Sequence, residues 1–71
     1  MTEEEKAIWR AACGLYAKYR GRIPQAEDFM TMSQDAGKAC AQFKNSRLIL
    51  KLVLAVIDYY EELYKQLATN N

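Results

Sequence analysis

Residues 47–67 read RLILKLVLAVIDYYEELYKQL, and this stretch decides the fold. Its apolar residues recur at steps of three and four, the period of an α-helix. The core line is predicted to comprise Ile49, Val53, Val56, Tyr60, Leu63 and Leu67. The most apolar part, 48–57, includes Lys51 and is about half of the roughly 20 residues that span a bilayer. We therefore expect a core helix of a globular domain and no membrane insertion.

The apolar surface of this helix is wider than one core requires. A surface helix normally has an apolar arc only somewhat wider than about 100°, but here Leu50, Leu54 and Ile57 form a second apolar stripe beside the core line. On the other side the arc is extended by Leu48, Leu52 and Tyr59, and the clearest solvent face comprises Lys51, Asp58, Glu62 and Lys65. Either the helix is unusually central in the domain, or the second apolar stripe contacts another chain.

The N-terminal segment is predicted to be a helix over 3–20. Thr2 and Glu5 have the spacing of a capping box, and the acids at the start suit the positive end of the helix dipole. Its apolar face comprises Ile8, Ala12, Leu15 and Tyr19, flanked by Trp9 and Tyr16. Gly21 is the expected C-terminal stop.

A second helix is predicted over 25–43, after the break at Pro24. Gly37 lies at the border of its apolar stripe, which indicates close approach of another helix. Asn45 is expected to adopt the left-handed conformation and Ser46 to cap the helix over 47–67, with residues 68–71 frayed. Short connections favour antiparallel neighbours, so 1–71 is predicted to be one all-α domain, an up-down-up three-helix bundle.

Composition places the chain among ordered globular domains. It has 71 residues, of which 51% are hydrophobic and 27% charged, enough of both for one small core with a solvated surface. The net charge of +1 provides no strong field for gathering nucleic acid. The start Met1-Thr2-Glu3-Glu4-Glu5 is acidic where a signal peptide is basic, which favours a cytoplasmic location.

The residues needed for common catalytic sites are missing from the sequence. The chain has no histidine, which removes the commonest general base and the commonest zinc ligand. The acids Glu27 and Asp28 fit the first turn of a helix, and Asp58, Glu61 and Glu62 are expected to be solvated. No Gly-rich phosphate-binding motif is present. We therefore expect no enzyme activity, cofactor or metal.

The two cysteines are expected to stay apart. In an antiparallel pair of the first two helices, Cys13 and Cys40 are offset by about eight residues, or ~12 Å along the axis. A disulfide needs Cα atoms within about 7 Å. Both are predicted to be free, buried thiols.

The segment 6–22, most of which belongs to the helix predicted over 3–20, suggests a nucleic-acid alternative. This segment contains no acidic residue, and its five cations are Lys6, Arg10, Lys18, Arg20 and Arg22. Cations interleaved with aromatics are typical of single-strand binding. Against this, the aromatic residues are predicted to belong to the core stripe, and several cations complement a helix C-terminus. Tyr16, Tyr19, Tyr60 and Tyr64 are expected to meet at one end of the bundle.

Four short segments are similar to a known group of proteins. They are Tyr16-Ala17-Lys18-Tyr19-Arg20-Gly21, Ala26-Glu27-Asp28-Phe29, Lys44-Asn45-Ser46 and Ala55-Val56-Ile57-Asp58. With these segments the chain resembles short uncharacterised helical proteins of prophages and other mobile elements of Firmicutes. Where that group often has an aromatic pair, this chain has Phe29-Met30. The resemblance implies a bacterial cytoplasmic setting and an accessory role, with no site residue.

The leading hypothesis is a non-enzymatic protein–protein interaction module. It would self-associate as a homodimer, or dock on a larger protein, through the second apolar stripe and Trp9. A symmetric dimer would hide aliphatic surface that a small core leaves exposed. The alternative is a small nucleic-acid-binding accessory protein that uses the basic side of the first helix.

Overall fold

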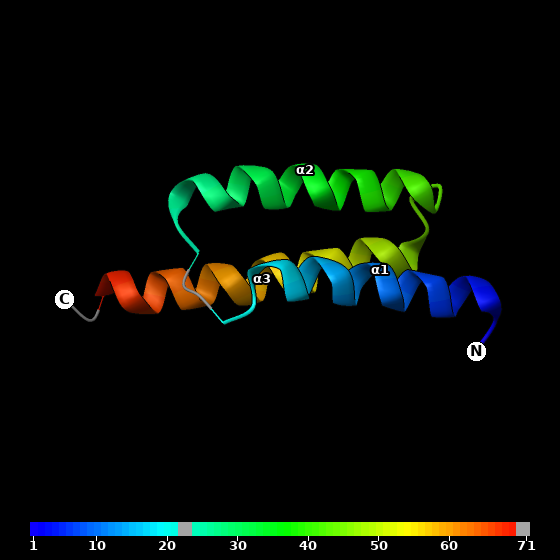
Figure 1. Cartoon of the computed structure of the whole chain (residues 1–71), viewed down its shortest axis with the longest axis horizontal. Helices are drawn as coiled ribbons and strands as arrows, with labels where there is room; N and C mark the ends of the chain where they lie inside the picture. Colours follow the sequence, from blue (N-terminus) through cyan, green and yellow to red (C-terminus); the bar gives the residue numbers. More distant parts are fainter. Residues whose placement is uncertain (22–23, 70–71) are drawn as a thin grey trace.

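The computed structural model describes residues 1–21 and 24–69, which form three α-helices (Figure 1). α1 spans Glu3–Tyr19, α2 spans Ala26–Gln42 and α3 spans Arg47–Thr69. Each helix packs against the other two, with α1 and α3 running side by side in the same direction and α2 running back along them. The predicted up-down-up bundle is confirmed.

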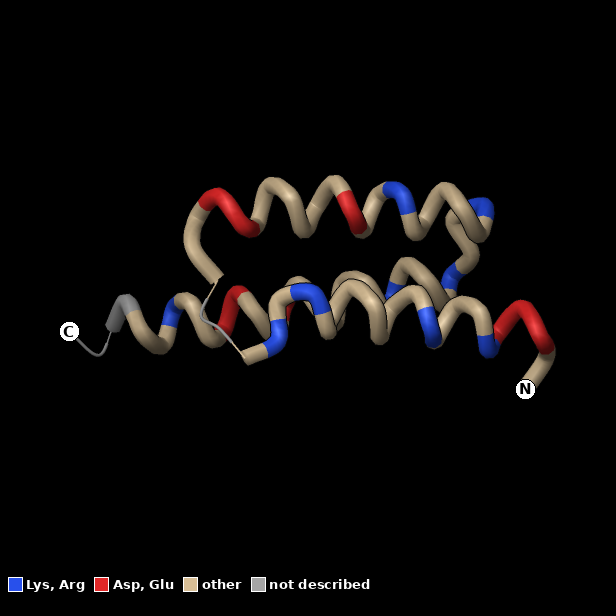
Figure 2. The backbone as a smooth tube through the Cα atoms, in the orientation of Figure 1, with Lys and Arg blue, Asp and Glu red and all other residues tan. Residues whose placement is uncertain are grey.

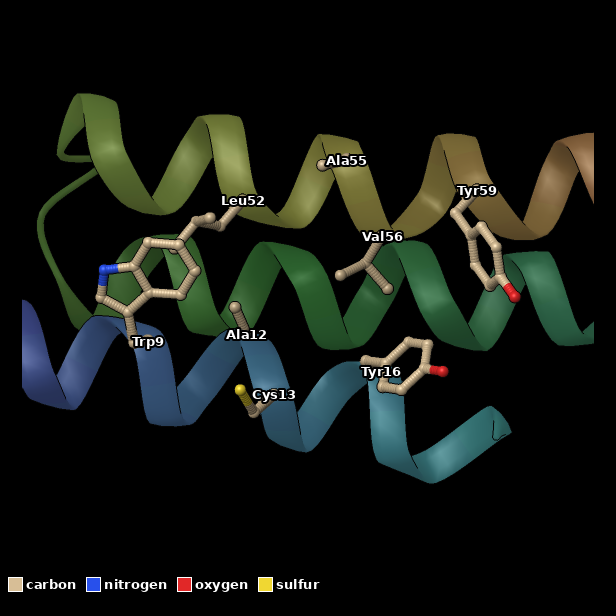
Figure 3. Close-up of a pocket in the computed structure, with 8 residues that line it drawn as sticks. All are labelled: Trp9, Ala12, Cys13, Tyr16, Leu52, Ala55, Val56 and Tyr59. Atoms are coloured by element: carbon tan, nitrogen blue, oxygen red, sulfur yellow. The ribbon is translucent and has the colours of Figure 1, made fainter. Parts of the chain in front are cut away.

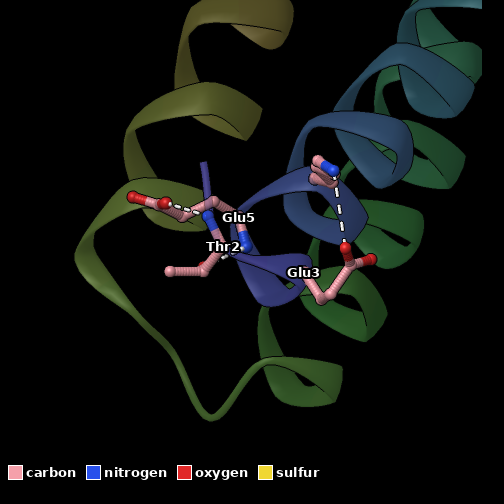
Figure 4. A network of polar contacts seen from close by, with 4 residues as sticks. Thr2, Glu3 and Glu5 are labelled. Carbon is pink, nitrogen blue, oxygen red and sulfur yellow. Dashed lines mark hydrogen bonds and ion pairs between the residues drawn. The ribbon is translucent and has the colours of Figure 1, made fainter.

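Both ends of α1 follow from local sequence. The Thr2 hydroxyl accepts a hydrogen bond from Glu5 N at 3.1 Å, and Thr2 N donates to Glu5 Oε1 at 2.7 Å (Figure 4). This reciprocal pair satisfies two of the amides that a helix N-terminus leaves without partners. After Tyr19 the chain turns at Gly21, whose φ of 84° is the left-handed conformation that glycine adopts without strain. The predicted cap and stop are confirmed.

The connection between α2 and α3 is a tight turn. Asn45 has a φ of 56°, and its amide donates to the Cys40 carbonyl at 2.7 Å. The Ile49 amide donates to Ser46 Oγ at 3.4 Å, so Ser46 caps α3 as predicted. Lys44 shares the left-handed conformation with a φ of 55°, which the sequence did not indicate.

The core lies along the line where all three helices meet. Met32 of α2 and Ile49 of α3 are fully buried, and Tyr19 and Tyr60 close the core with 1% and 2% of their surface exposed. The remaining buried hydrophobic residues are Ile8, Ala12, Leu15, Ala36, Cys40 and Val53. No helix within the described residues is long and apolar enough to cross a membrane.

Near its C-terminus α3 differs from the prediction. The helix continues through Thr69, two residues past the predicted end at Leu67, and Asn70 and Asn71 lie outside the described residues, so the expected fraying of 68–71 stays a prediction. Leu67, assigned to the core line, is 42% exposed. The reason is that α3 extends past the end of α1, which leaves its last turns with less to pack against (Figure 1).

Gly37 does not mark a close approach of helices. A Cβ atom at this position would have no neighbour within 4 Å, and the residue is exposed. α2 instead contacts the core through Ala36 and Cys40, on the neighbouring side of the helix. The prediction of close packing at Gly37 is therefore wrong.

Candidate functional site

An open groove runs between α1 and α3, and we call it the aromatic groove (Figure 3). It has a volume of about 440 Å³. Its lining is almost entirely apolar and comprises Trp9, Ala12, Cys13, Tyr16, Leu52, Ala55, Val56 and Tyr59. Surface concavities lined by aromatic and aliphatic side chains are typical places for a ligand or another protein to bind.

The groove exists because small residues separate large ones. Figure 3 shows Trp9 and Leu52 at one end and Tyr16 and Tyr59 at the other, with short side chains such as Ala55 in between. The aromatic side chains remain substantially in solvent: the exposed fractions are 44% for Trp9, 38% for Tyr16 and 46% for Tyr59. Tryptophan and tyrosine are the residues most enriched at the centres of protein interfaces.

A tyrosine cluster forms one end of the groove. The Tyr16 ring stacks on Tyr60 with ring centroids 5.8 Å apart, and Tyr19 packs edge-on against Tyr60 at 6.1 Å. The Tyr60 hydroxyl donates to the Tyr16 carbonyl at 2.7 Å. Burial raises the pKa of Tyr60, and neighbouring tyrosines add to the shift. Of the four tyrosines predicted to meet, three do so, and the prediction is wrong for Tyr64, which packs on Phe29 of α2 instead.

The second apolar stripe lies on the opposite flank of α3 from the aromatic groove. Leu54 is 62% exposed and Leu50 is 38% exposed, while Ile57 is half-buried and packs against the core. The bundle therefore does not cover the whole apolar arc of α3. Both flanks of this helix, one with Leu54 and one with Tyr59, present large apolar side chains to solvent.

The five cations of the nucleic-acid alternative do not form one free basic surface. Lys18 is paired with Asp35 of α2, with Nζ 2.6 Å from Oδ2, and this hydrogen bond lowers the pKa of Asp35. Lys6 is 3.4 Å from Glu3. Arg10 and Arg20 are exposed, and Arg22 lies outside the described residues. In Figure 2 the basic residues are spread along α1, with an acidic segment at its start.

The cysteines are both free, but their environments differ. Cys40 is buried as predicted, whereas Cys13 is exposed in the aromatic groove, so its predicted burial is wrong. Cys13 follows the buried Ala12 directly, and a step of one residue rotates a side chain by about 100° around a helix. That rotation takes the thiol out of the core.

On the α1 wall of the groove, the sequence indicated only Trp9 as a docking residue. Trp9 and Tyr16 were expected on the core stripe, yet both are exposed. They are two helical turns apart and each follows a core position, Ile8 and Leu15, by one residue. Because both aromatic residues follow a core position by one residue, they lie on the same face of α1 beside the core stripe. This spacing is the signal in the sequence that could have identified the α1 wall of the groove. On α3, Leu52 and Tyr59 were correctly placed beyond the core line.

Comparisons with protein-family models, curated proteins and solved structures find no match to this chain. Over residues 1–21 and 24–69, no group of three or more His, Cys, Asp or Glu side chains is arranged to hold a metal ion. The site must therefore be interpreted from its own geometry, which is an apolar, aromatic concavity beside exposed aliphatic side chains. Such a surface is suited to bury another apolar surface.

Proposed function

We propose that this chain is a non-enzymatic protein–protein interaction module that associates with a second copy of itself through α3. The exposure of Leu54 is the observation that supports this most directly, since 62% of its surface is in solvent while the core beside it is already complete. Full burial of a leucine is worth roughly 1.5–3 kcal/mol, so Leu54 alone has about 1–2 kcal/mol to gain in each copy.

The setting of the proposal follows from the sequence. A chain without histidine has few routes to acid–base or nucleophilic catalysis near neutral pH. The two free thiols fit a reducing compartment, which supports a cytoplasmic location. The resemblance to proteins of Firmicutes mobile elements supports an accessory role in a bacterium. Nucleic-acid binding remains the alternative, although two of its five cations are engaged in ion pairs within the chain.

The test is the change Leu54→Glu, followed by the mass in solution at micromolar concentration. We expect the unmodified chain to be a dimer and the variant to be a monomer with the same helical circular dichroism, because Leu54 is largely exposed within one copy. Gln34→Glu is the matched control, since it adds the same charge at an exposed position of α2 and should leave the dimer intact. A monomeric unmodified chain, or a Leu54→Glu variant that dimerises equally well, would refute the proposal.

A further inference from the structure

The second apolar stripe of α3 has charges of opposite sign at its two ends. Along this side of the helix, residues follow one another at steps of three and four in the order Arg47, Leu50, Leu54, Ile57 and Glu61. The apolar residues are therefore in the middle, with a cation one turn before them and an acid one turn after them. Figure 2 shows the basic residues near the start of α3 and the acidic residues further along.

Each end of the stripe has two like charges. Lys51 lies one turn after Arg47, and both are exposed. Asp58 lies one turn before Glu61, and both of these acids are exposed as well. Like charges three or four residues apart on a helix repel each other. The ion pairs found among the described residues join α1 to itself and to α2, so they compensate none of these four charges. Opposite charges from another chain would compensate them.

The surface of α3 is hollowed beside Leu54. A shallow depression of about 310 Å³ is lined by Lys51, Leu54, Ala55, Ile57, Asp58 and Glu61. Its lining therefore combines apolar residues of the stripe with charged residues from both ends. Such a hollow on a helix is where a side chain of a second helix inserts.

Leu54 is the midpoint of the charge pattern. Arg47 and Glu61 are each seven residues from it, or about 10 Å along the helix axis. A second α3 that crosses the first at Leu54 and runs in the opposite direction therefore brings Arg47 level with the partner's Glu61. Lys51 comes within one residue of the level of the partner's Asp58. This side of α3 is thus complementary to itself, as a symmetric dimer requires.

We infer that the second copy of this chain lies antiparallel on α3, with a two-fold axis beside Leu54. The inference rests on the proposed self-association and specifies its geometry. Leu54 packs against the partner's Leu54 at the axis, and Leu50 packs against the partner's Ile57. Arg47 pairs with the partner's Glu61 beyond these apolar contacts. Because the axis is two-fold, each contact away from it is made twice. The aromatic groove, on the opposite flank of α3, stays open in this dimer.

A parallel arrangement would bring like charges together. A two-fold axis along the helices places every residue of α3 level with the same residue of the second copy. Arg47 would then be level with the partner's Arg47, and Glu61 with the partner's Glu61. Like charges that face each other across an interface oppose association. Charge complementarity therefore selects the antiparallel direction for the same apolar stripe.

The first experiment locates the axis by disulfide formation. All variants include Cys13→Ser, because Cys13 is exposed whereas Cys40 is buried. One chain has Arg47→Cys and another has Glu61→Cys, and diamide is added to each chain alone and to their mixture. In the antiparallel dimer the two introduced thiols of the mixture are level with each other. Either chain alone has its thiols about 21 Å apart along the axis, whereas a disulfide needs Cα atoms within about 7 Å.

We expect the mixture to form a covalent heterodimer, measured by intact mass, at least about tenfold faster than either chain alone forms a covalent homodimer. The two single chains are the matched controls for each other, since each has one new thiol on the same side of α3. In a parallel dimer the order would be reversed. Faster cross-linking of the single chains, or equal rates in all three samples, would overturn the antiparallel axis.

The second experiment exchanges the charges of the inferred pair. Arg47→Glu and Glu61→Arg alone should each raise the dimer dissociation constant by about tenfold, because each change replaces two attractions with two repulsions. The double variant Arg47→Glu/Glu61→Arg should restore the dissociation constant. A double variant as weak as either single one would overturn the inferred register. If Leu54→Glu still abolished the dimer in that case, the proposed self-association would stand, whereas a monomeric unmodified chain would refute both.

Discussion

The contact between Tyr60 and α1 offers a test of the bundle at a single atom. The change Tyr60→Phe removes only the hydroxyl that donates to the Tyr16 carbonyl at 2.7 Å. Tyr16 lies in the last turn of α1, where helix carbonyls lack an intrahelical partner. The hydroxyl therefore does two things: it ties α3 to α1 and caps the end of α1.

The expected cost is that of one buried hydrogen bond. Tyr60 is 2% exposed, so water has little access to replace the lost donor. A hydrogen bond of this kind contributes about 0.5–1.5 kcal/mol to the free energy of unfolding. In a domain of this size 1 kcal/mol corresponds to roughly 4–8 °C in Tm, and we expect a decrease of that order. Tyr59→Phe is the matched control, because Tyr59 is 46% exposed and should tolerate the change.

Alkaline pH gives a second measurement on the same variant. Burial raises the pKa of Tyr60 in the folded chain, so as pH rises past about 10 the unfolded chain loses this proton first. Stability from Tyr60 is therefore complete below that pH and is lost as pH approaches the folded pKa. Thermal melts followed by circular dichroism should show a shallower alkaline decline for Tyr60→Phe than for the unmodified chain. An unchanged Tm together with an unchanged alkaline decline would refute this account of the contact.

Four further results are expected. Gly37→Ala should raise the free energy of unfolding by about 0.5–1 kcal/mol in a urea titration, because alanine favours a helix more than glycine does and the added Cβ meets nothing within 4 Å. A lower free energy of unfolding would contradict the open space around this position. Cys13 should react at once with a thiol reagent in the folded chain and Cys40 only on unfolding, so two immediate thiols would contradict the packing. The hydrogen bond from Lys18 lowers the pKa of Asp35 in the folded chain, so the stabilisation from this ion pair is complete above the unfolded pKa near 4 and is lost as pH falls. Asp35→Asn should therefore flatten the acid side of a plot of stability against pH. An unchanged plot would show that the ion pair contributes nothing to stability. DNA binding at physiological salt should be weak, and sub-micromolar affinity would favour the nucleic-acid alternative.

Local sequence determined most of the fold. The capping residues Thr2 and Ser46 and the left-handed Asn45 set helix boundaries through contacts within a few residues, so they are visible in the sequence. The core line of α3 was also visible, because apolar residues at helical spacing identify one inward face. Ile49, Val53 and Tyr60 are buried as that line predicts.

Tertiary structure decided which of the remaining apolar residues reach solvent. A helical wheel places Trp9 and Tyr16 close to the core stripe, but their exposure depends on where α3 lies beside α1 and on how short the side chains between them are. Leu67 belongs to the core line by its spacing and is exposed because α1 ends before it. The angular position of a residue on its own helix is a local property, whereas its burial depends on the lengths and positions of two other helices. For this reason the sequence alone located the core and the second apolar stripe, and only the packed bundle created the aromatic groove.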